Sequence, residues 1–355
     1  MNKEKQLDET AIHLLQQLIA TPSFSKDEDQ TAIIIEGFFK QRDILTERFG
    51  NNVIVRNRYF DNDKPTILLN SHHDTVRPNA GYTRDPFLAE IEDEKLYGLG
   101  SNDAGGALVC LIAAFLHFYP EKDLQYNLVL AATAEEEISG TGGIESILDN
   151  LPVIDFAIVG EPTQCNLAVA ERGLMVLDCV AKGKAGHAAR EEGVNALYKA
   201  IDDIQWFKTY SFPKESRTLG KIKMSVTMIN AGKQHNVVPE ACDYTVDVRV
   251  NDQYSLEEVL DTIRRHVSSE VKPRSMRMRP SGIALDHPIV TAALASGLTT
   301  FGSPTTSDQA LIPVPSVKIG PGDSARSHTA DEFIYVAEIV EGIGTYIKLL
   351  NAVLH

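Results

Sequence analysis

Short apolar runs that do not alternate with polar residues constrain the fold of this chain most strongly. They cover residues 66–70, 127–133 and 156–159. A strand with this pattern is buried on both faces, as in a sheet covered by helices. Helical periodicity predicts such helices, over residues 6–19, 26–41, 104–118, 289–299 and 332–353. The sequence therefore predicts a three-layer α/β domain.

The pattern changes near residue 174. Three segments then alternate apolar and polar residues, at 174–182, 222–230 and 243–250. Such alternation is typical of an antiparallel sheet with one open face. Residues 195–208 and 255–268 read as amphipathic helices, so the order resembles a small α+β sandwich. We predict that residues 173–285 form a smaller domain inserted into a larger one, which comprises residues 1–172 together with 286–355.

Composition excludes several classes of function. The 355 residues include 49 acidic and 34 basic side chains, a formal charge of −15. Such a surface disfavours nucleic acid and anionic lipid as partners. The four scattered cysteines indicate no disulfide framework, and we expect neither a signal peptide nor a membrane span. The expected location is the cytoplasm.

A histidine pair directly follows the first apolar run, in Ser71-His72-His73-Asp74. Residues i and i+2 of a strand point to the same face, so His72 could bind a metal while Asp74 orients its ring. His73 is the alternative ligand, and we prefer His72 because it gives the His-x-Asp spacing. Alone, such a segment is more often an ordinary polar loop.

Further carboxylates and an imidazole follow strands or lie in Gly-rich turns, at Asp103, Glu135–Glu137, Glu161 and His328. Each has an ordinary alternative: a helix N-cap, a solvated helix start, an exposed turn and a capping loop, respectively. Together they form a nitrogen and oxygen ligand set without thiolate. That set fits Zn²⁺, with Co²⁺ or Mn²⁺ able to substitute. It exceeds the needs of one tetrahedral zinc, which favours two ions joined by a bridging carboxylate.

Five ordered segments then carry a resemblance: SHHDTV, YGLGSNDAGG, TAEEEISG, IVGEPT and SARSHTADE. They resemble the co-catalytic zinc family of acetylornithine deacetylase, succinyl-diaminopimelate desuccinylase, aminoacylase and glutamate carboxypeptidase. The resemblance spans nearly the whole chain. It implies a zinc-peptidase-like catalytic domain, and an inserted domain that serves as lid and dimerisation domain of a homodimer.

The resemblance also implies the ligands of two Zn²⁺ ions per subunit. His72 and Glu161 would bind one ion, and Glu137 and His328 would bind the other. Asp103 would bridge both.

Other roles follow from the same resemblance. Asp103 would precede a cis peptide bond to Ala104. Glu136 would be the general base that takes a proton from water and returns it to the leaving amine. Asp74 would support His72, and His187 would stabilise the oxyanion, from its own or the partner subunit.

Asn236 and Arg249 resemble family positions near the substrate carboxylate, and Arg172 is a further candidate there. Ser307 lies in a segment that resembles a family loop facing the substrate. Arginine suits carboxylate capture because its planar group donates two parallel hydrogen bonds. Each of these residues could instead be an ordinary surface or turn residue.

The predicted reaction is hydrolysis of the amide bond of a small-molecule N-acyl amino acid. We expect N-acetylornithine, or a related N-acetyl or N-succinyl ornithine or citrulline, in arginine biosynthesis. The alternatives are a succinyl-diaminopimelate desuccinylase and a dipeptidase or carboxypeptidase of the same family. A non-enzymatic metal-binding relative is disfavoured, because Glu136 and all five ligand candidates are present.

Overall fold

The computed structural model describes residues 3–190 and 192–355, and the chain divides into two compact units. The first unit comprises Met1–Val169, Gly282–Phe301 and Ser307–His355. The second comprises Ala170–Ser281 and Gly302–Thr306. The return of the short segment Gly302–Thr306 to the second unit was not predicted from the sequence.

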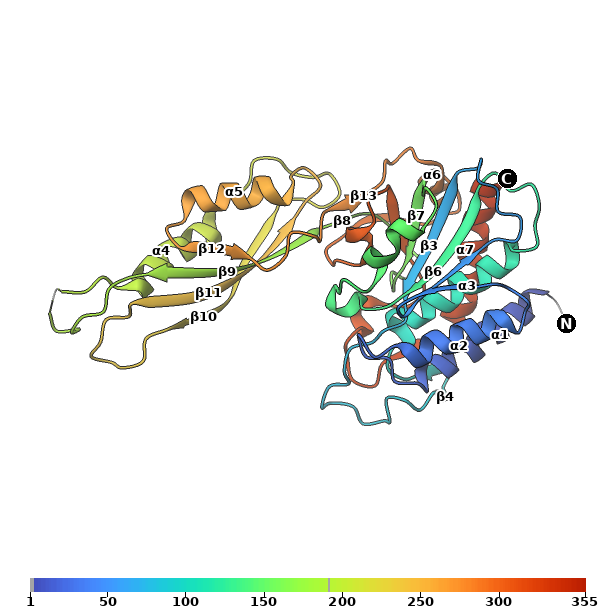
Figure 1. The fold of residues 1–355 in the computed structure, drawn as a ribbon, viewed down its shortest axis with the longest axis horizontal. Coiled ribbons are helices and arrows are strands. Elements are labelled where there is room, and N and C mark those ends of the chain that lie inside the picture. The colour runs from blue at the N-terminus through green and yellow to red at the C-terminus, as the bar shows by residue number, and fades with distance from the viewer. Residues whose placement is uncertain (1–2, 191) are drawn as a thin grey trace. The chain divides into compact units, whose positions relative to one another are not determined.

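A nine-stranded mixed sheet organises the first unit (Figure 1). Its strand order is β1-β2-β6-β3-β7-β15-β8-β13, and β14 pairs with β8. The bounds are β1 Glu47–Phe49, β2 Asn52–Arg56, β3 Thr66–His72, β6 Asn127–Thr133, β7 Phe156–Gly160, β8 Leu167–Glu171, β13 Ser281–Gly282, β14 Thr300–Ser303 and β15 Ser316–Ile319.

The centre of this sheet is parallel. β3 pairs in parallel with both β6 and β7, and β15 pairs in parallel with β7. Every residue of these four strands is buried, as the apolar runs predict. Their carboxyl ends therefore meet at one edge of the sheet.

Helices cover one face of the sheet: α1 Lys3–Ile19, α2 Asp29–Lys40, α3 Gly106–Phe118, α6 Pro288–Ala295 and α7 Val336–Leu354. Their apolar residues form one core with alternate residues of the strands, such as Ile67 and Leu69 of β3. On the opposite face, Leu68 packs with residues of the short 3₁₀ helices η3 Ile144–Asn150 and η4 Asp308–Leu311 and their flanks. The predicted α/β class is confirmed, although 3₁₀ helices and loops form the second covering layer.

The segment Ser101–Phe118 is apolar and long enough to cross a membrane, which the sequence analysis did not expect. Of its residues, 83% are buried within the structure. Helix α3 contacts α1, α7, β3 and β6, so its apolar surface is the surface of a core helix.

A small sheet of β4 Ile91–Glu92, β5 Lys95–Tyr97 and β16 Phe333–Tyr335 also belongs to the first unit. Strand β16 shortens the last helix, which was predicted from residue 332 but begins at Val336. The helix predicted from residue 104 begins at Gly106, after the irregular segment η1 Ser101–Gly105.

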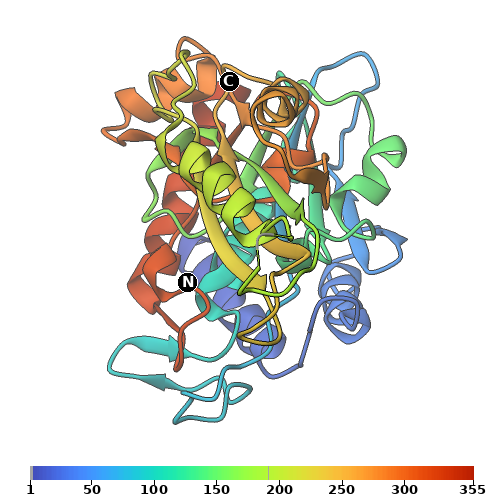
Figure 2. The same cartoon turned by 90° about the vertical axis from the view of Figure 1, so that its left-hand side faces the viewer.

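The second unit is an α+β sandwich (Figure 2). Its antiparallel sheet has the order β10-β11-β9-β12, with β9 Gly173–Lys182, β10 Lys223–Ala231, β11 Ala241–Val250 and β12 Glu270–Pro273. Helices α4 Ala196–Thr209 and α5 Leu256–His266 share one core with the buried alternate residues of β9 and β11. The alternation in the sequence thus predicted this sheet and its open face correctly.

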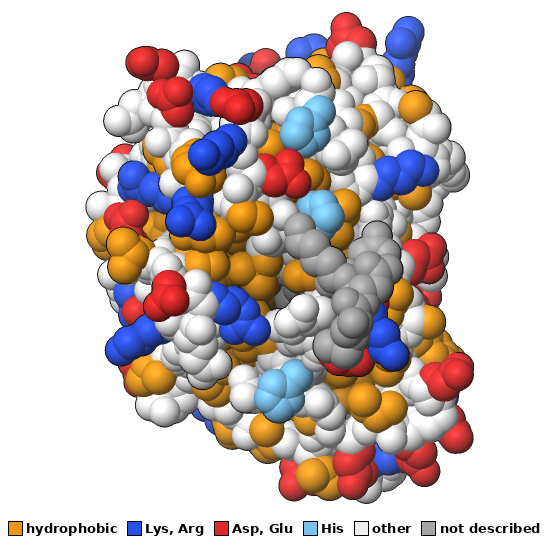
Figure 3. All heavy atoms as spheres, turned by 90° about the vertical axis from the view of Figure 1, so that its right-hand side faces the viewer, with side chains coloured by type: hydrophobic (Ala, Val, Ile, Leu, Met, Phe, Trp, Pro, Cys, Tyr) orange, Lys and Arg blue, Asp and Glu red, His pale blue; other side chains and the backbone are white. Residues whose placement is uncertain are grey.

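The surface carries charges of both signs. On the face drawn in Figure 3, acidic and basic side chains are interspersed with apolar ones.

Candidate metal centre

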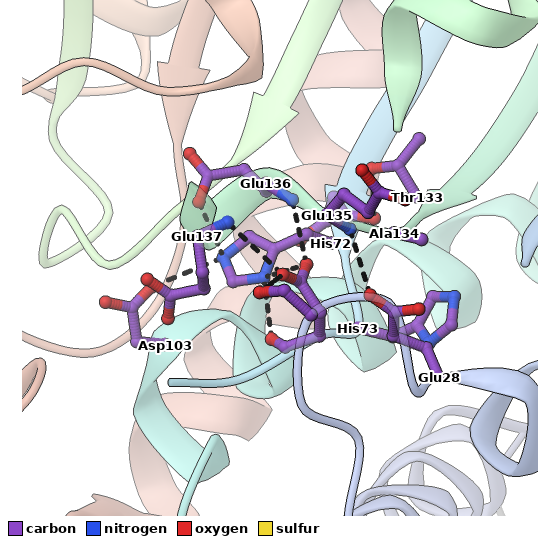
Figure 4. Close-up of polar contacts among 12 residues, drawn as sticks. Glu28, His72, His73, Asp103, Thr133, Ala134, Glu135, Glu136 and Glu137 are labelled. Carbon is purple, nitrogen blue, oxygen red and sulfur yellow. Dashed lines mark hydrogen bonds and ion pairs between the residues drawn. The ribbon is translucent and has the colours of Figure 1, made fainter. Parts of the chain in front are cut away.

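The first unit gathers the predicted metal ligands at the carboxyl edge of its parallel strands. His72 is the last residue of β3, Glu136 and Glu137 follow β6 closely, and Glu161 directly follows β7. Ligands commonly bind at this edge of an α/β sheet, because the loops of neighbouring strands converge there. The ring of His72 points toward Glu136, Glu137 and Asp103 (Figure 4).

Three carboxylates surround Nε2 of His72. Oδ1 of Asp103 lies 3.5 Å away, and Oε2 of Glu136 and Oε1 of Glu161 each lie 3.8 Å away. The His72 side chain is 1% exposed, and these distances exceed those of an ordinary hydrogen bond. Among the residues that the structure describes, Nε2 of His72 therefore has no hydrogen-bond partner.

Asp103 faces two histidines with its two oxygens. While Oδ1 faces His72, Oδ2 lies 3.7 Å from Nε2 of His328. His328 also lies 2.9 Å from Oε2 of Glu137. Segments from both ends of the chain thus meet around one carboxylate, in the positions expected of a bridging ligand.

The donor set fits a divalent cation. The ligand atoms of His72, Asp103 and Glu137 lie within 4.8 Å of one another, as do those of His72, Glu136 and Glu161. Two ligand atoms on one tetrahedral zinc are about 3.3–3.6 Å apart, given bonds of about 2.0–2.2 Å. The separations around His72 are close to this value. The orphaned Nε2 therefore accords with a nitrogen that an ion would bind.

His73 has a different environment from His72. Its Nδ1 pairs with the hydroxyl of Thr31 at 2.8 Å, and its Nε2 pairs with the carbonyl of Asn51 at 2.9 Å. Both ring nitrogens are thereby engaged in the protein. Burial lowers the pKa of His73 to about 4, so this imidazole is neutral at physiological pH.

Asp74 contacts His72 and also the loop Glu135–Glu137, the glutamate loop. Nδ1 of His72 lies 3.0 Å from the carbonyl of Asp74 and 3.4 Å from its carboxylate. The same carboxylate accepts the backbone N–H groups of Glu136 and Glu137, at 3.0 and 3.2 Å, and the hydroxyl of Ser25. One carboxylate therefore orients both the imidazole and the adjacent loop.

The charges at this centre shift several pKa values. Burial lowers the pKa of His72, but Asp103, Asp74 and Glu136 outweigh it and raise this pKa well above its usual value. The hydrogen bond that His328 donates to the carboxylate of Glu137 is the main reason that the pKa of His328 rises to about 9. Burial raises the pKa of Glu136 well above its usual value, and the neighbouring carboxylates add to this effect. Such a concentration of negative charge favours binding of a cation.

Glu332 is a residue of this centre that the sequence analysis missed. Its buried carboxylate accepts the backbone N–H groups of Gly100, Asn102 and Asp103, at 3.2, 2.8 and 3.0 Å. It thereby holds the loop that carries Asp103. The acidic residue just before an apolar strand was the available signal, but an exposed glutamate has the same appearance in a sequence.

Asp308 is a second such residue. It is buried, it accepts the hydroxyl of Thr133 at 2.8 Å, and burial raises its pKa to about 6. It lies next to Ser307, which is buried and caps η4 by accepting the N–H of Gln309.

The peptide bond between Asp103 and Ala104 is cis, as the resemblance implied. The backbone of Asp103 and Ala104 departs from helical geometry, so the regular helix α3 starts beyond them.

The other predicted site residues lie in the second unit. His187 and Asn236 are exposed on neighbouring segments, where the N–H of Ala188 donates to the carbonyl of Asn236 at 3.0 Å. Arg249 makes two hydrogen bonds to Asp247 and one to Thr306. Arg172 donates to the carbonyl of Leu219. The structure therefore gathers the metal-ligand candidates in one unit and these four residues in the other.

Known proteins are similar to this chain over most of its length. Residues 68–352 match the family model described as peptidase family M20/M25/M40. The chain is 28% identical to an acetylornithine deacetylase of Proteus mirabilis, with 93% of each chain covered. It is 25% identical to a succinyl-diaminopimelate desuccinylase of Rickettsia bellii, with 94% of this chain and 91% of the relative covered.

Solved structures share the fold. An aminopeptidase PepT from Bacillus cereus has a TM-score of 0.78 at 18% identity, covering 98% of this chain and 99% of that one. A dinuclear metal binding peptidase of the M20 family from Bacillus subtilis has a TM-score of 0.76 at 17% identity, covering 99% of each chain. Because the family model covers most of the sequence, the chain belongs to peptidase family M20/M25/M40.

Proposed function

We propose that the protein hydrolyses the amide bond of an N-acyl amino acid, with N-acetylornithine or a related N-acetyl or N-succinyl ornithine or citrulline as substrate. One observation carries the proposal: the two oxygens of Asp103 face His72 and His328, with Glu136 beside them. This arrangement suits two divalent cations on either side of a shared carboxylate. We further propose Zn²⁺ as the native metal, with Co²⁺ or Mn²⁺ able to replace it.

The proposed ligands of the two ions are as follows. His72 and Glu161 would hold one ion, Glu137 and His328 the other, and Asp103 both. When bound, the ions supply Lewis-acid activation of a water molecule and of the amide carbonyl.

Glu136 takes a proton from the attacking water and delivers it to the nitrogen of the leaving amine. Its raised pKa supports this role, because a more basic carboxylate accepts a proton from water more readily. One water molecule is consumed, and a carboxylic acid and an amine are formed.

We propose that Arg172, Asn236 and Arg249 recognise the substrate carboxylate, and that His187, of the same or the partner subunit, donates a hydrogen bond to the oxyanion. Ser307 remains a substrate-binding candidate, although its burial and capping role also account for it structurally.

We also propose a cytoplasmic homodimer. All four cysteines are free and buried, which accords with a reducing compartment. Strand β10 is an edge of the second unit's sheet, and its residues Met228 and Ile229 are 64% and 52% exposed. Tyr198 and Ile201 add exposed apolar area on α4. An open edge with apolar neighbours suits pairing with the same edge of a second copy.

A substrate panel tests the proposed reaction. Zinc-loaded protein would be assayed for amine release from N-acetylornithine, N-succinylornithine, N-acetylcitrulline, N-succinylcitrulline, N-succinyl-diaminopimelate and a set of dipeptides. We expect the highest kcat/KM on an N-acyl ornithine or citrulline, and loss of activity after chelation. Preferred turnover of N-succinyl-diaminopimelate would assign the protein to the desuccinylases. Dipeptide cleavage without deacylation would assign it to the peptidases.

A further inference from the structure

Three consecutive backbone N–H groups of the glutamate loop donate to buried carboxylates. The N–H of Glu135 donates to Oε1 of Glu28 at 3.2 Å, while those of Glu136 and Glu137 donate to Asp74. The two acceptors belong to different segments, because Glu28 precedes α2 and Asp74 follows β3. Figure 4 shows Glu28 beside Glu135. The direction of the loop is therefore set by side chains outside it.

Glu135 has a structural part in this loop. Its backbone adopts the left-handed conformation, with φ of 56°, and its carboxylate accepts the N–H of Gly142 at 3.2 Å. A Cβ at Gly140 or Gly142 would come within 2.0 or 2.3 Å of that carboxylate. The turn therefore encloses the Glu135 side chain. Glu136 and Glu137 are the two that face the histidines.

Glu28 is an unusual residue to find inside the protein. It is fully buried, and its carboxylate accepts hydrogen bonds from the backbone N–H groups of Lys26 and Glu135 and from the side-chain amide of Asn51, three uncharged donors. A buried carboxylate requires such hydrogen bonds to offset its lost hydration. A neutral side chain of similar size could fill the same space with a smaller desolvation penalty. A carboxyl group at this position therefore calls for a functional reason.

The contacts of Glu28 also reach the strand that carries His72. Nδ2 of Asn51 donates to Oε2 of Glu28 at 2.8 Å, and the carbonyl of Asn51 pairs with Nε2 of His73. Glu28 therefore lies between the end of β3 and the glutamate loop. A displacement of its carboxylate would alter the placement of Glu135 and of the residue after it.

We propose that Glu28 is a positioning residue for Glu136. This inference rests on the proposed function, in which Glu136 is the general base. Glu28 fixes the Glu135 end of the loop and Asp74 fixes the next two N–H groups, so that the Glu136 carboxylate is held beside the metal centre. A small displacement of a catalytic group costs rate because proton transfer requires close alignment.

The test compares Glu28→Gln and Glu28→Asp with Asp203→Asn. The glutamine keeps the size but replaces one acceptor by a donor, and the aspartate keeps the charge but is too short to hold Glu135. Asp203 is a matched control in the second unit, because it is also buried and accepts two backbone N–H groups, those of Ser268 and Ser269. Each variant would be measured for kcat, KM, bound metal and Tm, on the substrate that the wild-type protein turns over best.

We expect both Glu28 variants to lose about 10- to 100-fold in kcat, with KM and bound metal close to wild type. Asp203→Asn should lower Tm about as much as the Glu28 substitutions do, but it should leave kcat unchanged. If the Glu28 variants keep wild-type kcat, or lose metal in proportion to kcat, the inference is overturned. A Glu136→Gln variant separates the two proposals, because full activity in that variant would refute the proposed function whatever Glu28 does.

Discussion

His72 and His73 are adjacent in the sequence, but Nε2 of His72 faces carboxylates whereas both ring nitrogens of His73 have neutral hydrogen-bond partners. His73 is paired through both nitrogens to Thr31 and Asn51, whereas Nε2 of His72 faces Asp103 at 3.5 Å. Burial brings the pKa of His73 to about 4, and nearby carboxylates raise that of His72. These surroundings give His73 a structural role, and they support the proposal that His72 is the metal ligand.

The first prediction concerns the ligand. His72→Ala should bind metal at least about 10-fold more weakly, whereas His73→Gln should bind it normally, because glutamine can keep a donor and an acceptor for Thr31 and Asn51. Metal content after dialysis, measured by mass spectrometry, checks this. Metal loss in the His73 variant alone would reverse the assignment.

The second prediction concerns acid stability. His73 has a pKa of about 4 in the folded protein and about 6.5 in the unfolded chain, so between these values the unfolded state binds the extra proton. Stability should therefore fall as pH drops from 6.5 to 4, by at most about 3 kcal/mol from this residue. Urea unfolding of the metal-free protein at several pH values measures it. His73→Gln should flatten the profile in that window, and an unchanged profile would contradict the assigned pKa.

The third prediction concerns the proposed base. Glu136→Gln should lower kcat by about 10²- to 10⁴-fold, because the amide cannot take a proton from water. Bound metal should stay at the wild-type level. Single-turnover and steady-state assays with parallel metal analysis provide the measurement. Wild-type activity in this variant would remove Glu136 from the mechanism.

The fourth prediction concerns Glu332. Its carboxylate holds three backbone N–H groups of the loop before α3, so Glu332→Gln should weaken metal binding by about 10- to 100-fold through Asp103. Competition with a chromophoric chelator reports the affinity. An unchanged affinity together with a lower Tm would limit Glu332 to a structural role.

The fifth prediction concerns assembly. If β10 pairs with a second copy, the double substitution Met228→Lys and Ile229→Lys should convert the protein to a monomer at micromolar concentration. Val153→Lys is the control, because Val153 is also apolar and, at 92% exposure, even more accessible, but it lies in the first unit. Light scattering coupled to gel filtration measures the mass. A monomeric wild-type protein would contradict the proposal at once.

Local patterns in the sequence predicted most of the fold. The buried strands β3, β6 and β7 were found because an unbroken apolar run carries its own signal, and β9 and β11 because alternation does. Strand β16 and segment Gly302–Thr306 were missed, because pairing with distant partners defines them. Short segments of this kind have little periodicity of their own.

The residues of the candidate site were also predicted only in part. Histidines and acids in ordered motifs identified the ligand candidates, and the structure brings them together. Glu28 and Glu332 were missed because an acidic residue beside a helix or strand is ordinary in a sequence. Only the fold reveals that both are buried and that both accept backbone N–H groups of loops more than a hundred residues away.

The spread of the ligand candidates along the chain has a consequence for synthesis. His72 ends strand β3, whereas His328 lies far later in the sequence, just before β16. A polypeptide still emerging from the ribosome would contain the first histidine long before the second. We therefore expect full metal loading to wait until the segment that carries His328 has been made and has folded against β3, which would make metal uptake a sensitive reporter of chains that lack this segment.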